Sequence, residues 1–443
     1  MLARPQARAA VLSVLAALAI PGTVLLGAPP PASAQTDLQR EVDRRATEVL
    51  PKVIAWRRDI HQNPELGNRE TRTSALVADH LRKLGYEVRT NVAHTGVVGI
   101  LRGGKPGPVV ALRADMDALP VTEQADVPFA SKVRTTYNGQ EVGVMHACGH
   151  DVHTAVLMGA AEALAGVRQE LPGTVKLIFQ PAEEGVPPGE EGGAKMMMAQ
   201  GVLADPAPQA IFALHTTTLP GGTLAYKAGS IYASADVLKI VVRGRQTHAA
   251  MPWQGIDPVI LSAQIILALQ TIPSRQLDPF LPNVVTISTV HGGVRNNILP
   301  DEVVMEGTIR SLNPALHEDF LARIRRTAES IATNAGATAE VTITPYAPVT
   351  VNDAALTRRM EPTLQRIAGT SLSGTPGSMA AEDFSFFAQE VPGLYVFLGI
   401  NPPGVEPGEA APNHSPRFFV HEDSMVVGIR TMAGLAVDYL MGE

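Results

Sequence analysis

The segment MHACGHD (145–151) holds two histidines, an aspartate and the only cysteine of the 443-residue chain. Thiolate and imidazole groups are ligands that zinc and related divalent metals take. A lone cysteine cannot form a disulfide within its own chain. Cys148 is therefore a buried apolar residue, an intermolecular link, a nucleophile or a metal ligand, and the segment alone leaves these four interpretations open.

Other residues able to bind metal or transfer protons come at or just after apolar segments typical of buried strands. These segments are PVVALRADM (108–116), TVKLIFQ (174–180) and AIFAL (210–214), and the residues are Asp115, Asp117, Glu183, Glu184 and His215. Ligands of parallel sheets bind at the carboxyl ends of the strands, so we expect these side chains to share one edge. Neighbouring side chains of an extended stretch point in opposite directions. One of Glu183 and Glu184 can therefore bind metal while the other transfers protons.

The composition describes an ordinary globular protein. Hydrophobic residues make up 45% of the chain, charged residues 18%, and the formal net charge is -7. This charge gives no basic surface, so we expect no nucleic-acid partner. A chain of this length can bury a large core and is expected to form two domains.

Residues 1–34 have a different character. Arg4 and Arg8 precede a long apolar stretch, which ends at the small residues Ala32, Ser33 and Ala34. This order predicts a signal peptide over residues 1–34, and hence an exported protein that is periplasmic or secreted. A retained membrane anchor is the alternative. We expect no other segment to be long and apolar enough to span a bilayer, and so no stable membrane insertion after cleavage.

The remaining chain predicts two kinds of architecture. Residues 35–230 and 347–443 alternate apolar strands with amphipathic helices, which is typical of an α/β fold with a mostly parallel sheet covered by helices. Residues 231–346 follow the order β-α-β-β-α-β, which indicates a ferredoxin-like unit. We therefore expect a catalytic domain interrupted by an inserted ferredoxin-like domain.

Seven motifs occur in a fixed order along the chain after the predicted signal. They are WRRDIHQNPELG (56–67), RADMDALP (113–120), MHACGHDVHTA (145–155), QPAEEG (180–185), THAAMPWQGIDP (247–258), GTIR (307–310) and NHSP (413–416). Together they resemble the metal-dependent amidohydrolases of the M20 peptidase family. The resemblance is to the branch with hippurate hydrolases, N-acyl-amino-acid deacylases and indoleacetyl-amino-acid hydrolases.

This resemblance implies two divalent metal ions in each subunit. Cys148 would be shared by both metals and would act as a ligand and not as a nucleophile, because a coordinated thiol is deprotonated. His150 and His215 would complete one site, and Glu184 and His414 the other. Imidazole, carboxylate and thiolate suit zinc, with manganese, cobalt and nickel as alternatives.

The resemblance also implies roles for residues that bind no metal. Glu183 would be the general base that deprotonates the attacking water, and Asp117 would orient a metal ligand. The inserted domain would act as a lid and join two subunits into a homodimer. His248 would then serve the other subunit's active site by stabilising the tetrahedral oxyanion. Asn297 and Arg310 would hold the free carboxylate of the substrate.

Four positions raise three further questions. Asp115 stands where other branches of the family carry a histidine ligand, so the geometry of the first metal site is open. Asp151 could orient His150 or cap the following helix. Ala380 and Ala381 stand where glycine is common, which leaves the size of the pocket on that side open.

The expected function is that of an exported metal-dependent amidohydrolase. It would hydrolyse the amide bond of N-acyl amino acids, with hippurate-like compounds as substrates. The nearest alternative is a dipeptidase or carboxypeptidase-like exopeptidase that acts on small peptides. A third possibility is a non-catalytic protein that binds acylated amino acids, but the presence of Glu183 favours an enzyme.

Overall fold

The computed structural model describes residues 35–442, which belong to one compact unit. The predicted signal peptide, residues 1–34, lies outside the described residues. Its cleavage and the export of the protein therefore stay predictions.

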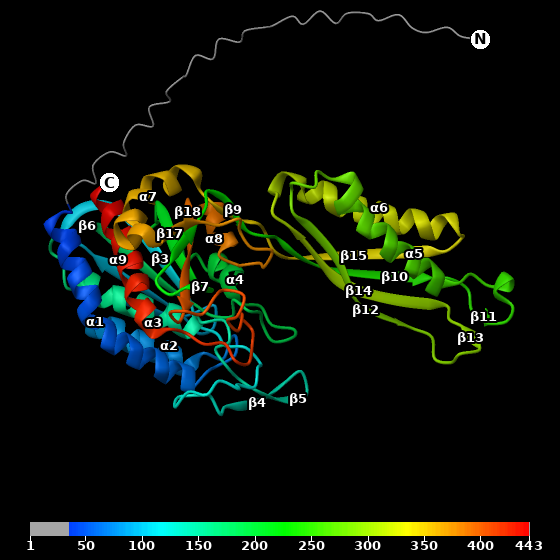
Figure 1. Ribbon diagram of the computed structural model, residues 1–443, viewed down its shortest axis with the longest axis horizontal. Helices are drawn as coiled ribbons and strands as arrows, with labels where there is room; N and C mark the ends of the chain where they lie inside the picture. The colour runs from blue at the N-terminus through cyan, green and yellow to red at the C-terminus, as the bar shows by residue number, and fades with distance from the viewer. Residues whose placement is uncertain (1–34, 443) are drawn as a thin grey trace, which may run out of the picture. The chain divides into compact units, whose positions relative to one another are not determined.

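The main sheet has eight strands in the order β1-β2-β6-β3-β7-β18-β8-β17 (Figure 1). Its four central strands run parallel to one another. These are β6 (Pro172–Gln180), β3 (Lys105–Asp115), β7 (Ala210–Pro220) and β18 (Gly393–Asn401). The outer strands are β1 (Glu87–Val92), β2 (Gly96–Arg102), β8 (Leu224–Tyr226) and β17 (Leu372–Gly374). The predicted α/β fold with a mostly parallel sheet is confirmed.

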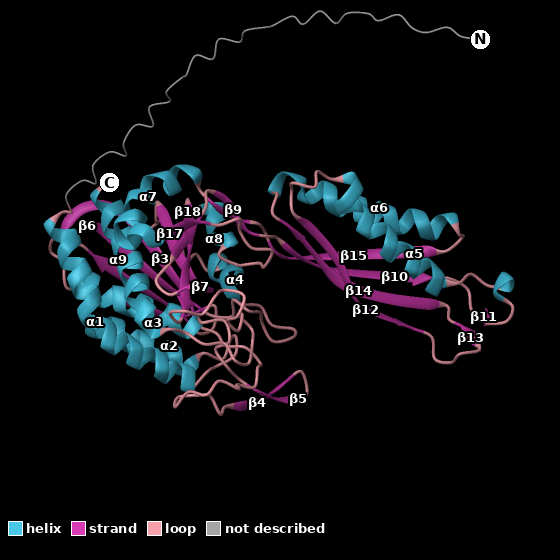
Figure 2. Ribbon diagram, in the orientation of Figure 1, coloured by secondary structure: helices cyan, strands magenta, loops and turns pink. Residues whose placement is uncertain are grey.

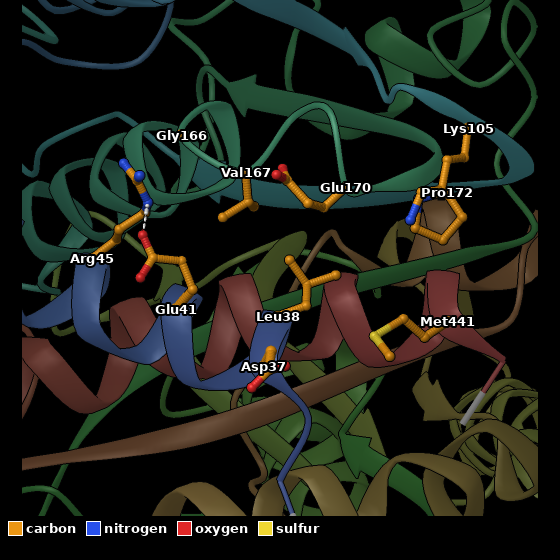
Figure 3. A pocket seen from close by; sticks show the side chains of 10 residues that line it. All are labelled: Asp37, Leu38, Glu41, Arg45, Lys105, Gly166, Val167, Glu170, Pro172 and Met441. Carbon is orange, nitrogen blue, oxygen red and sulfur yellow. Dashed lines mark hydrogen bonds and ion pairs between the residues drawn. The ribbon is translucent and has the colours of Figure 1, made fainter.

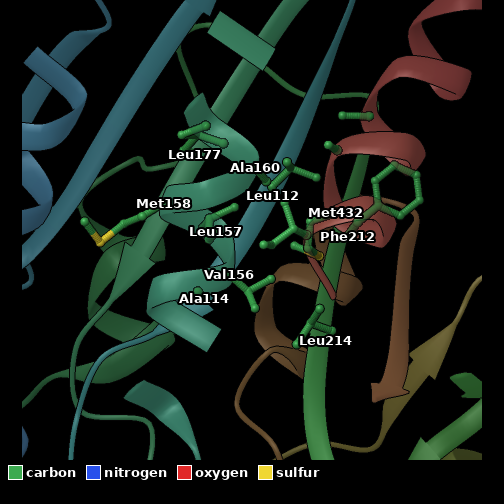
Figure 4. Close-up of a cluster of buried hydrophobic side chains, with 14 of the residues drawn as sticks. Leu112, Ala114, Val156, Leu157, Met158, Ala160, Leu177, Phe212, Leu214 and Met432 are labelled. Carbon is green, nitrogen blue, oxygen red and sulfur yellow. The ribbon is translucent and has the colours of Figure 1, made fainter. Parts of the chain in front are cut away.

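Helices cover both faces of this sheet. Along β3, Val110, Leu112 and Ala114 belong to one core and Ala111 to the other, because successive strand residues point to opposite faces. Figure 4 shows the larger core, where Leu112 and Phe212 from the sheet lie near Val156 and Met432 from two helices. The helices on this face are α1 (Asp37–Gln62), α2 (Thr71–Lys83), α3 (His150–Ala165), α7 (Ala354–Ala368) and α9 (Met425–Met441). The opposite face carries α4 (Gly193–Ala199) and α8 (Ser385–Glu390).

One helical segment corrects an expectation from the sequence. Residues Glu422–Met441, which end in α9, are long and apolar enough to cross a membrane by length and composition. However, 78% of that apolar window is buried inside the protein. The segment is apolar because α9 packs against α1, α3 and the sheet, and a buried helix needs no polar face.

Residues 235–347 contain a second sheet, with the antiparallel strand order β12-β14-β10-β15 (Figure 2). Its strands are β10 (Ala235–Arg243), β12 (Asn283–Gly292), β14 (Glu302–Ser311) and β15 (Thr338–Ala347). Residues of α5 (Pro258–Thr271) and α6 (Pro314–Asn334) share one apolar core with it. A short pair, β11 (Thr247–His248) with β13 (Ile298–Leu299), extends from it. The domain boundaries 231 and 346, and the role of a lid, stay predictions.

The smaller elements connect these sheets. A hairpin of β4 (Arg134–Tyr137) and β5 (Gln140–Gly143) precedes the MHACGHD segment. The strands β9 (Gly229–Tyr232) and β16 (Thr350–Asn352) pair where the chain enters and leaves the four-stranded sheet. Short helical turns occur at Pro252–Gln254, Ile272–Gln276, Gly369–Ser371 and Glu422–Ser424.

The carboxyl ends of β3 and β6 and the start of α3 position the predicted site residues. Asp115 ends β3, Gln180 ends β6, and His150 begins α3. His215 differs from expectation, because β7 continues past it to Pro220. The strand continues because β18 pairs with it along that stretch.

Gly149 allows Cys148 and His150 to flank a sharp turn into α3. Its φ of +88° lies in the left-handed region that side chains rarely adopt. A Cβ atom at this position would lie 2.2 Å from Oγ1 of Thr216. The glycine of the MHACGHD motif is therefore required both by backbone conformation and by the close approach of β7.

Candidate metal centre and active site

Cys148 is shared by two groups of side chains that could each hold a metal ion. The first group joins it to His150 and His215, and the second joins it to Glu184 and His414. Within each group the ligand atoms lie within 4.8 Å of one another. The five residues expected to bind metal thus come together from the start of α3, the loop after β6, strand β7 and the loop after β18. Their roles as ligands stay predictions.

The ring of His150 is oriented by a carboxylate behind it. Its Nδ1 atom lies 3.1 Å from Oδ1 of Asp117. Its Nε2 atom is buried, has no hydrogen-bond partner among the described residues, and lies 3.9 Å from carboxylate oxygens of both Glu183 and Glu184. A buried ring nitrogen without a partner is costly unless something binds it, so this atom fits a metal ion. Asp117 stands where the sequence predicted an orienting carboxylate.

The ring of His215 is oriented by the backbone. Its Nδ1 atom lies 2.7 Å from the carbonyl oxygen of Thr216 and donates to it. The lone pair of Nε2 then faces Sγ of Cys148 at 3.5 Å. Burial, and then the neighbouring His153, lower the pKa of His215 to about 3, so the ring is neutral and able to bind a metal.

The second group is held by the loop that carries the NHSP motif. Nε2 of His414 lies 3.0 Å from Oε1 of Glu184. The backbone N–H of His414 donates to the carbonyl of Ala147 at 2.7 Å, which joins this loop to the MHACGHD segment. The hydrogen bond from His414 and the nearby His150 lower the pKa of Glu184 against the opposing effect of burial.

The thiol of Cys148 lies in a buried and negatively charged environment. Burial, and then the carboxylates of Glu184 and Glu183, raise the pKa of Cys148 well above its usual value. In the protein chain alone the sulfur therefore stays protonated. A divalent cation reverses this, because it offsets the carboxylate charges and ionises a coordinated thiol. The buried sulfur, the two carboxylates and the free ring nitrogen of His150 fit a pair of divalent cations.

Glu183 lies in a turn, which corrects the expectation that it belongs to an extended stretch. Strand β6 ends at Gln180, and Ala182 has a φ of +52°. The two side chains still differ in their surroundings, because Glu184 contacts His414 while Glu183 is buried, and the division of their roles stays a prediction. Burial, and then the carboxylate of Glu382, raise the pKa of Glu183 well above its usual value.

A buried ionic cluster behind Glu183 was not predicted from the sequence. The guanidinium of Arg113 contacts Glu382 at 2.9 Å and Asp383 at 3.0 Å, and the backbone N–H of Asp383 donates to Glu183 at 3.4 Å. The adjacent acidic residues Glu382 and Asp383, directly after Ala380 and Ala381, were the sequence signal for this cluster.

Asp115, which stands where other branches of the family carry a histidine, is engaged by its neighbours. Its carboxylate contacts Arg113 at 2.6 Å and Nδ1 of His153 at 2.6 Å, and its Oδ1 lies 3.8 Å from Nδ1 of His150. His153 in turn accepts the backbone N–H of Thr216 at 2.9 Å. Asp115 therefore fixes the position of β7 next to His215 through His153.

Asp151 has neither of the roles considered from the sequence. Its Oδ2 atom accepts a hydrogen bond from Nε of Arg57 at 2.7 Å and lies 2.8 Å from Nδ1 of His61. Gly149 is the N-cap residue of α3, and Asp117 orients His150. The physical reason is that Arg57 is itself buried and needs a counter-ion.

Asn413, the first residue of the NHSP motif, also supports the candidate centre. Its side-chain amide donates to the carbonyl oxygens of Cys148 at 3.1 Å and Thr216 at 3.3 Å, and lies 3.7 Å from Sγ of Cys148. It therefore holds the segment of Cys148 and strand β7 together around the sulfur.

A cavity of about 710 Å³ contains the candidate centre. Arg310 from β14 lines it together with Cys148, Glu183 and Glu184. Among residues 35–442, the guanidinium of Arg310 has no hydrogen bond or ion pair, and burial lowers its pKa. Many arginines are explained by a surface ion pair, but Arg310 forms none with the described residues. Ala380 and Ala381 also line the cavity, as the sequence led us to expect.

Four predicted site residues do not line this cavity. Asp117 and His150 are buried beside it, whereas the other two are exposed. His248 is exposed in β11, where its Nδ1 accepts the backbone N–H of Ala250 at 3.0 Å. Asn297 is also exposed, and its carbonyl accepts the N–H of Ala249 at 3.1 Å. A single chain does not bring His248 and Asn297 to its own metal-ligand groups.

A different cavity, of about 670 Å³, lies where β3 and β6 begin (Figure 3). Its Arg45 is paired with Glu41 at 2.8 Å. The metal-ligand groups found in residues 35–442 include none of its lining residues. The metal-ligand groups of the described residues thus lie outside this cavity.

Comparison with known proteins agrees with this geometry. The family model of "Peptidase family M20/M25/M40" matches residues 111–438. The chain is 43% identical to thermostable carboxypeptidase 2 of Saccharolobus solfataricus, over 91% of this chain and 99% of that protein. It is 39% identical to an Arabidopsis thaliana IAA-amino acid hydrolase, ILR1-like 2, over 89% of this chain and 87% of that protein.

A solved structure is also similar. It is that of a Bacillus subtilis protein, a dinuclear metal-binding peptidase of the M20 family. The TM-score is 0.75 at 34% sequence identity, and the match covers 90% of this chain and 99% of that one.

Proposed function

Because this chain belongs to peptidase family M20/M25/M40, and is thus a hydrolase of amide or peptide bonds, we propose that it hydrolyses N-acyl amino acids with two divalent metal ions. Zinc suits the ligand set of thiolate, imidazole and carboxylate, and manganese, cobalt and nickel are alternatives. Hippurate-like compounds are the substrates that we expect.

One observation carries this proposal. A single cavity is lined by four of the five proposed metal ligands, by the buried carboxylate of Glu183 and by the unpaired guanidinium of Arg310. The metal ligands and Glu183 suit amide hydrolysis, and Arg310 suits a substrate with a free carboxylate. A planar guanidinium can bind a carboxylate through two parallel hydrogen bonds.

The residues divide the reaction between them. Divalent cations held by the two ligand groups would lower the pKa of water and polarise the amide carbonyl. Glu183 accepts the proton of the attacking water and then delivers it to the leaving nitrogen. Arg310 fixes the amino-acid carboxylate, so that the amide bond is held near Glu183. The apolar side chains of Leu219, Tyr232 and Phe397 in the same cavity favour an apolar acyl group or side chain.

Exopeptidase action is the second candidate function. It is supported by the 43% identity to a protein named as a carboxypeptidase. A dipeptide has the same free carboxylate and the same amide bond, so Arg310 and Glu183 would serve both reactions. The two candidates differ in whether the group on the amide carbonyl carries an amine.

A substrate panel separates them. The purified protein is assayed on hippurate, N-acetyl amino acids and dipeptides, each with and without added Zn²⁺ or Mn²⁺. We expect metal-dependent release of the amino acid from the acylated substrates, faster than from the dipeptides. Hydrolysis of dipeptides alone would favour the exopeptidase, and binding of acylated amino acids without turnover would favour a non-catalytic protein.

The role of Arg310 is tested with a matched pair of substrates. Arg310→Met should raise the KM for hippurate at least about tenfold, since one ion pair to a buried charge is worth more than about 1.4 kcal/mol. The KM for the methyl ester of hippurate, which lacks the carboxylate, should change little. An equal change for both compounds would show that Arg310 does not bind the carboxylate.

We also propose that two copies form a homodimer through the four-stranded sheet. The support is an exposed apolar surface on α5, where Val259, Ile260 and Leu267 are 46%, 56% and 71% exposed. Strand β12 forms an open edge of the sheet. In such a dimer the exposed His248 would serve the other subunit's centre. Leu267→Glu should give monomers in analytical ultracentrifugation, whereas Phe419→Glu, at an exposed residue of the main body, should not.

Export is the remaining part of the proposal. Its support is the order of basic, apolar and small residues in residues 1–34. N-terminal sequencing of the mature protein should begin at Gln35 if the segment is cleaved as predicted. A mature protein that starts at Met1 and sediments with membranes would show a retained anchor.

A further inference from the structure

The turn that carries Glu183 is held by three hydrogen bonds. The N–H of Ala182 donates to Oε1 of Glu70 at 2.8 Å, and the N–H of Glu184 donates to Oδ2 of Asp117 at 2.8 Å. The third bond runs from the hydroxyl of Tyr346 to the carbonyl oxygen of Glu183, at 3.1 Å. The turn contains a left-handed residue, Ala182, and such a conformation persists only when its surroundings fix it.

The three anchors come from different parts of the chain. Glu70 directly precedes α2 and Asp117 follows β3, so both belong to the body built on the eight-stranded sheet. Tyr346 lies on β15, the last strand of the four-stranded sheet. The backbone of Glu183 is therefore bonded to both sheets.

Tyr346 is not explained as a core residue. It is 47% exposed, although its hydroxyl is engaged. It lines the 710 Å³ cavity that contains the ligand groups and also a neighbouring cavity of about 620 Å³, where His317 and Lys195 are found. Its ring thus stands between two cavities, and its hydroxyl reaches the backbone of the residue that we identify as the base.

We propose that Tyr346 is a positioning residue, which ties the four-stranded sheet to the peptide group of Glu183 and so sets the place of the Glu183 carboxylate. The inference rests on the proposed function, since it takes Glu183 as the base. Movement of β15 relative to the main body shifts the Glu183 carbonyl through this bond. The four-stranded sheet thereby controls whether the base is correctly placed.

Two other roles for Tyr346 predict different results. If its ring only separates the cavities, the hydroxyl is dispensable. If its hydroxyl contacts the substrate directly, its removal acts independently of Glu183. The substitution Tyr346→Phe keeps the ring and removes only the hydroxyl, so it distinguishes all three roles when combined with a change at Glu183.

The first measurement compares Tyr346→Phe with wild type and with Tyr137→Phe, a matched change on the distant β4–β5 hairpin. We expect kcat for hippurate to fall about tenfold in Tyr346→Phe while KM stays within about twofold, since the bond positions the base and does not bind substrate. Metal content should be unchanged, and Tyr137→Phe should behave as wild type. Wild-type kinetics for Tyr346→Phe would overturn the proposal.

The second measurement is a double-mutant cycle on the residual activity of Glu183→Gln. If Tyr346 acts through the Glu183 carboxylate, adding Tyr346→Phe to Glu183→Gln should lower the rate no further. If the two effects multiply, Tyr346 acts on the substrate by itself and the proposal is wrong.

A third measurement does not depend on activity. Amide hydrogen exchange of residues 182–186 should be faster in Tyr346→Phe than in wild type and unchanged in Tyr137→Phe. If wild type hydrolysed no substrate of the panel, the proposed function would be wrong. The exchange rates would still show whether Tyr346 holds residues 182–186 in place. Faster exchange supports it, and unchanged exchange overturns it.

Discussion

Nδ1 of His150 lies 3.1 Å from Oδ1 of Asp117, and this contact turns the buried, unpartnered Nε2 of the same ring towards Glu183 and Glu184. With a metal ion on Nε2, the carboxylate would keep the ring proton on Nδ1. Asp117 would in this way orient a metal ligand without being one.

Asp117→Asn should therefore weaken metal binding by about 10- to 100-fold, because the neutral amide holds the ring less firmly. The affinity is measured by competition with a chromogenic chelator. The control is Asp126→Asn, the same substitution at an exposed aspartate nine residues further along the chain. Equal affinity in the two variants would contradict the role of Asp117.

Cys148→Ala should lose metal from both ligand groups, since the sulfur is common to them. We expect nearly complete loss of activity with a fold that is largely kept, because the surrounding sheet has its own apolar core. Elemental analysis gives the metal content and circular dichroism the fold. Full metal occupancy in this variant would remove Cys148 from the centre.

Glu183→Gln and Glu184→Gln should differ, although the residues are neighbours. Glu183→Gln should keep its metal and lose about 10²- to 10⁴-fold in kcat, since the amide cannot accept a proton. Glu184→Gln should lose metal affinity, because Glu184 belongs with Cys148 and His414 to one ligand group. Metal analysis and kinetics on both variants test this, and the same behaviour in both would disprove the division.

Mixing two inactive variants tests whether His248 acts across subunits. If it does, a heterodimer of His248→Ala and Glu183→Gln contains one site with an intact base and an intact histidine from the other chain. Activity should then return to roughly half of wild type for each heterodimer. Heterodimers that form without regaining activity would show that His248 acts within its own chain or has no role.

Lys176 gives a prediction about stability and pH. Burial lowers the pKa of Lys176 to about 8, while an unfolded lysine titrates near about 10.4. Between these values the unfolded chain binds more protons than the folded one, so the free energy of unfolding rises with pH in this window. Below pH 8 the folded protein therefore bears the full penalty of burying the charged ammonium.

The substitution Lys176→Met removes this titration. Relative to wild type, the variant should gain the most stability below about pH 8, and this gain should shrink as pH approaches about 10.4. Urea unfolding of both proteins over this range measures it. A difference that does not change with pH would show that Lys176 keeps an ordinary pKa in the folded protein.

The sequence by itself determined the sheet and the edge at which the chemistry lies. Apolar segments followed by Asp117 and by Glu183 and Glu184 predicted parallel strands with a site at their carboxyl ends, and β3 and β6 end as expected. This worked because strand periodicity and the position of polar residues after a strand are local properties of the chain. The grouping of Cys148 with the other four ligand candidates agrees with the resemblance.

Only the tertiary structure decided which side chains support that site. Asp151 meets Arg57, Glu382 meets Arg113, and Tyr346 meets Glu183, over separations of 94, 269 and 163 residues. A buried charge or polar group pairs with whichever partner the packing brings within reach. Local sequence patterns do not show which distant residues will be brought together. The prediction of an extended stretch at Glu183 was wrong for the same reason. The turn there is fixed by hydrogen bonds to three residues that lie far away in the chain, Glu70, Asp117 and Tyr346.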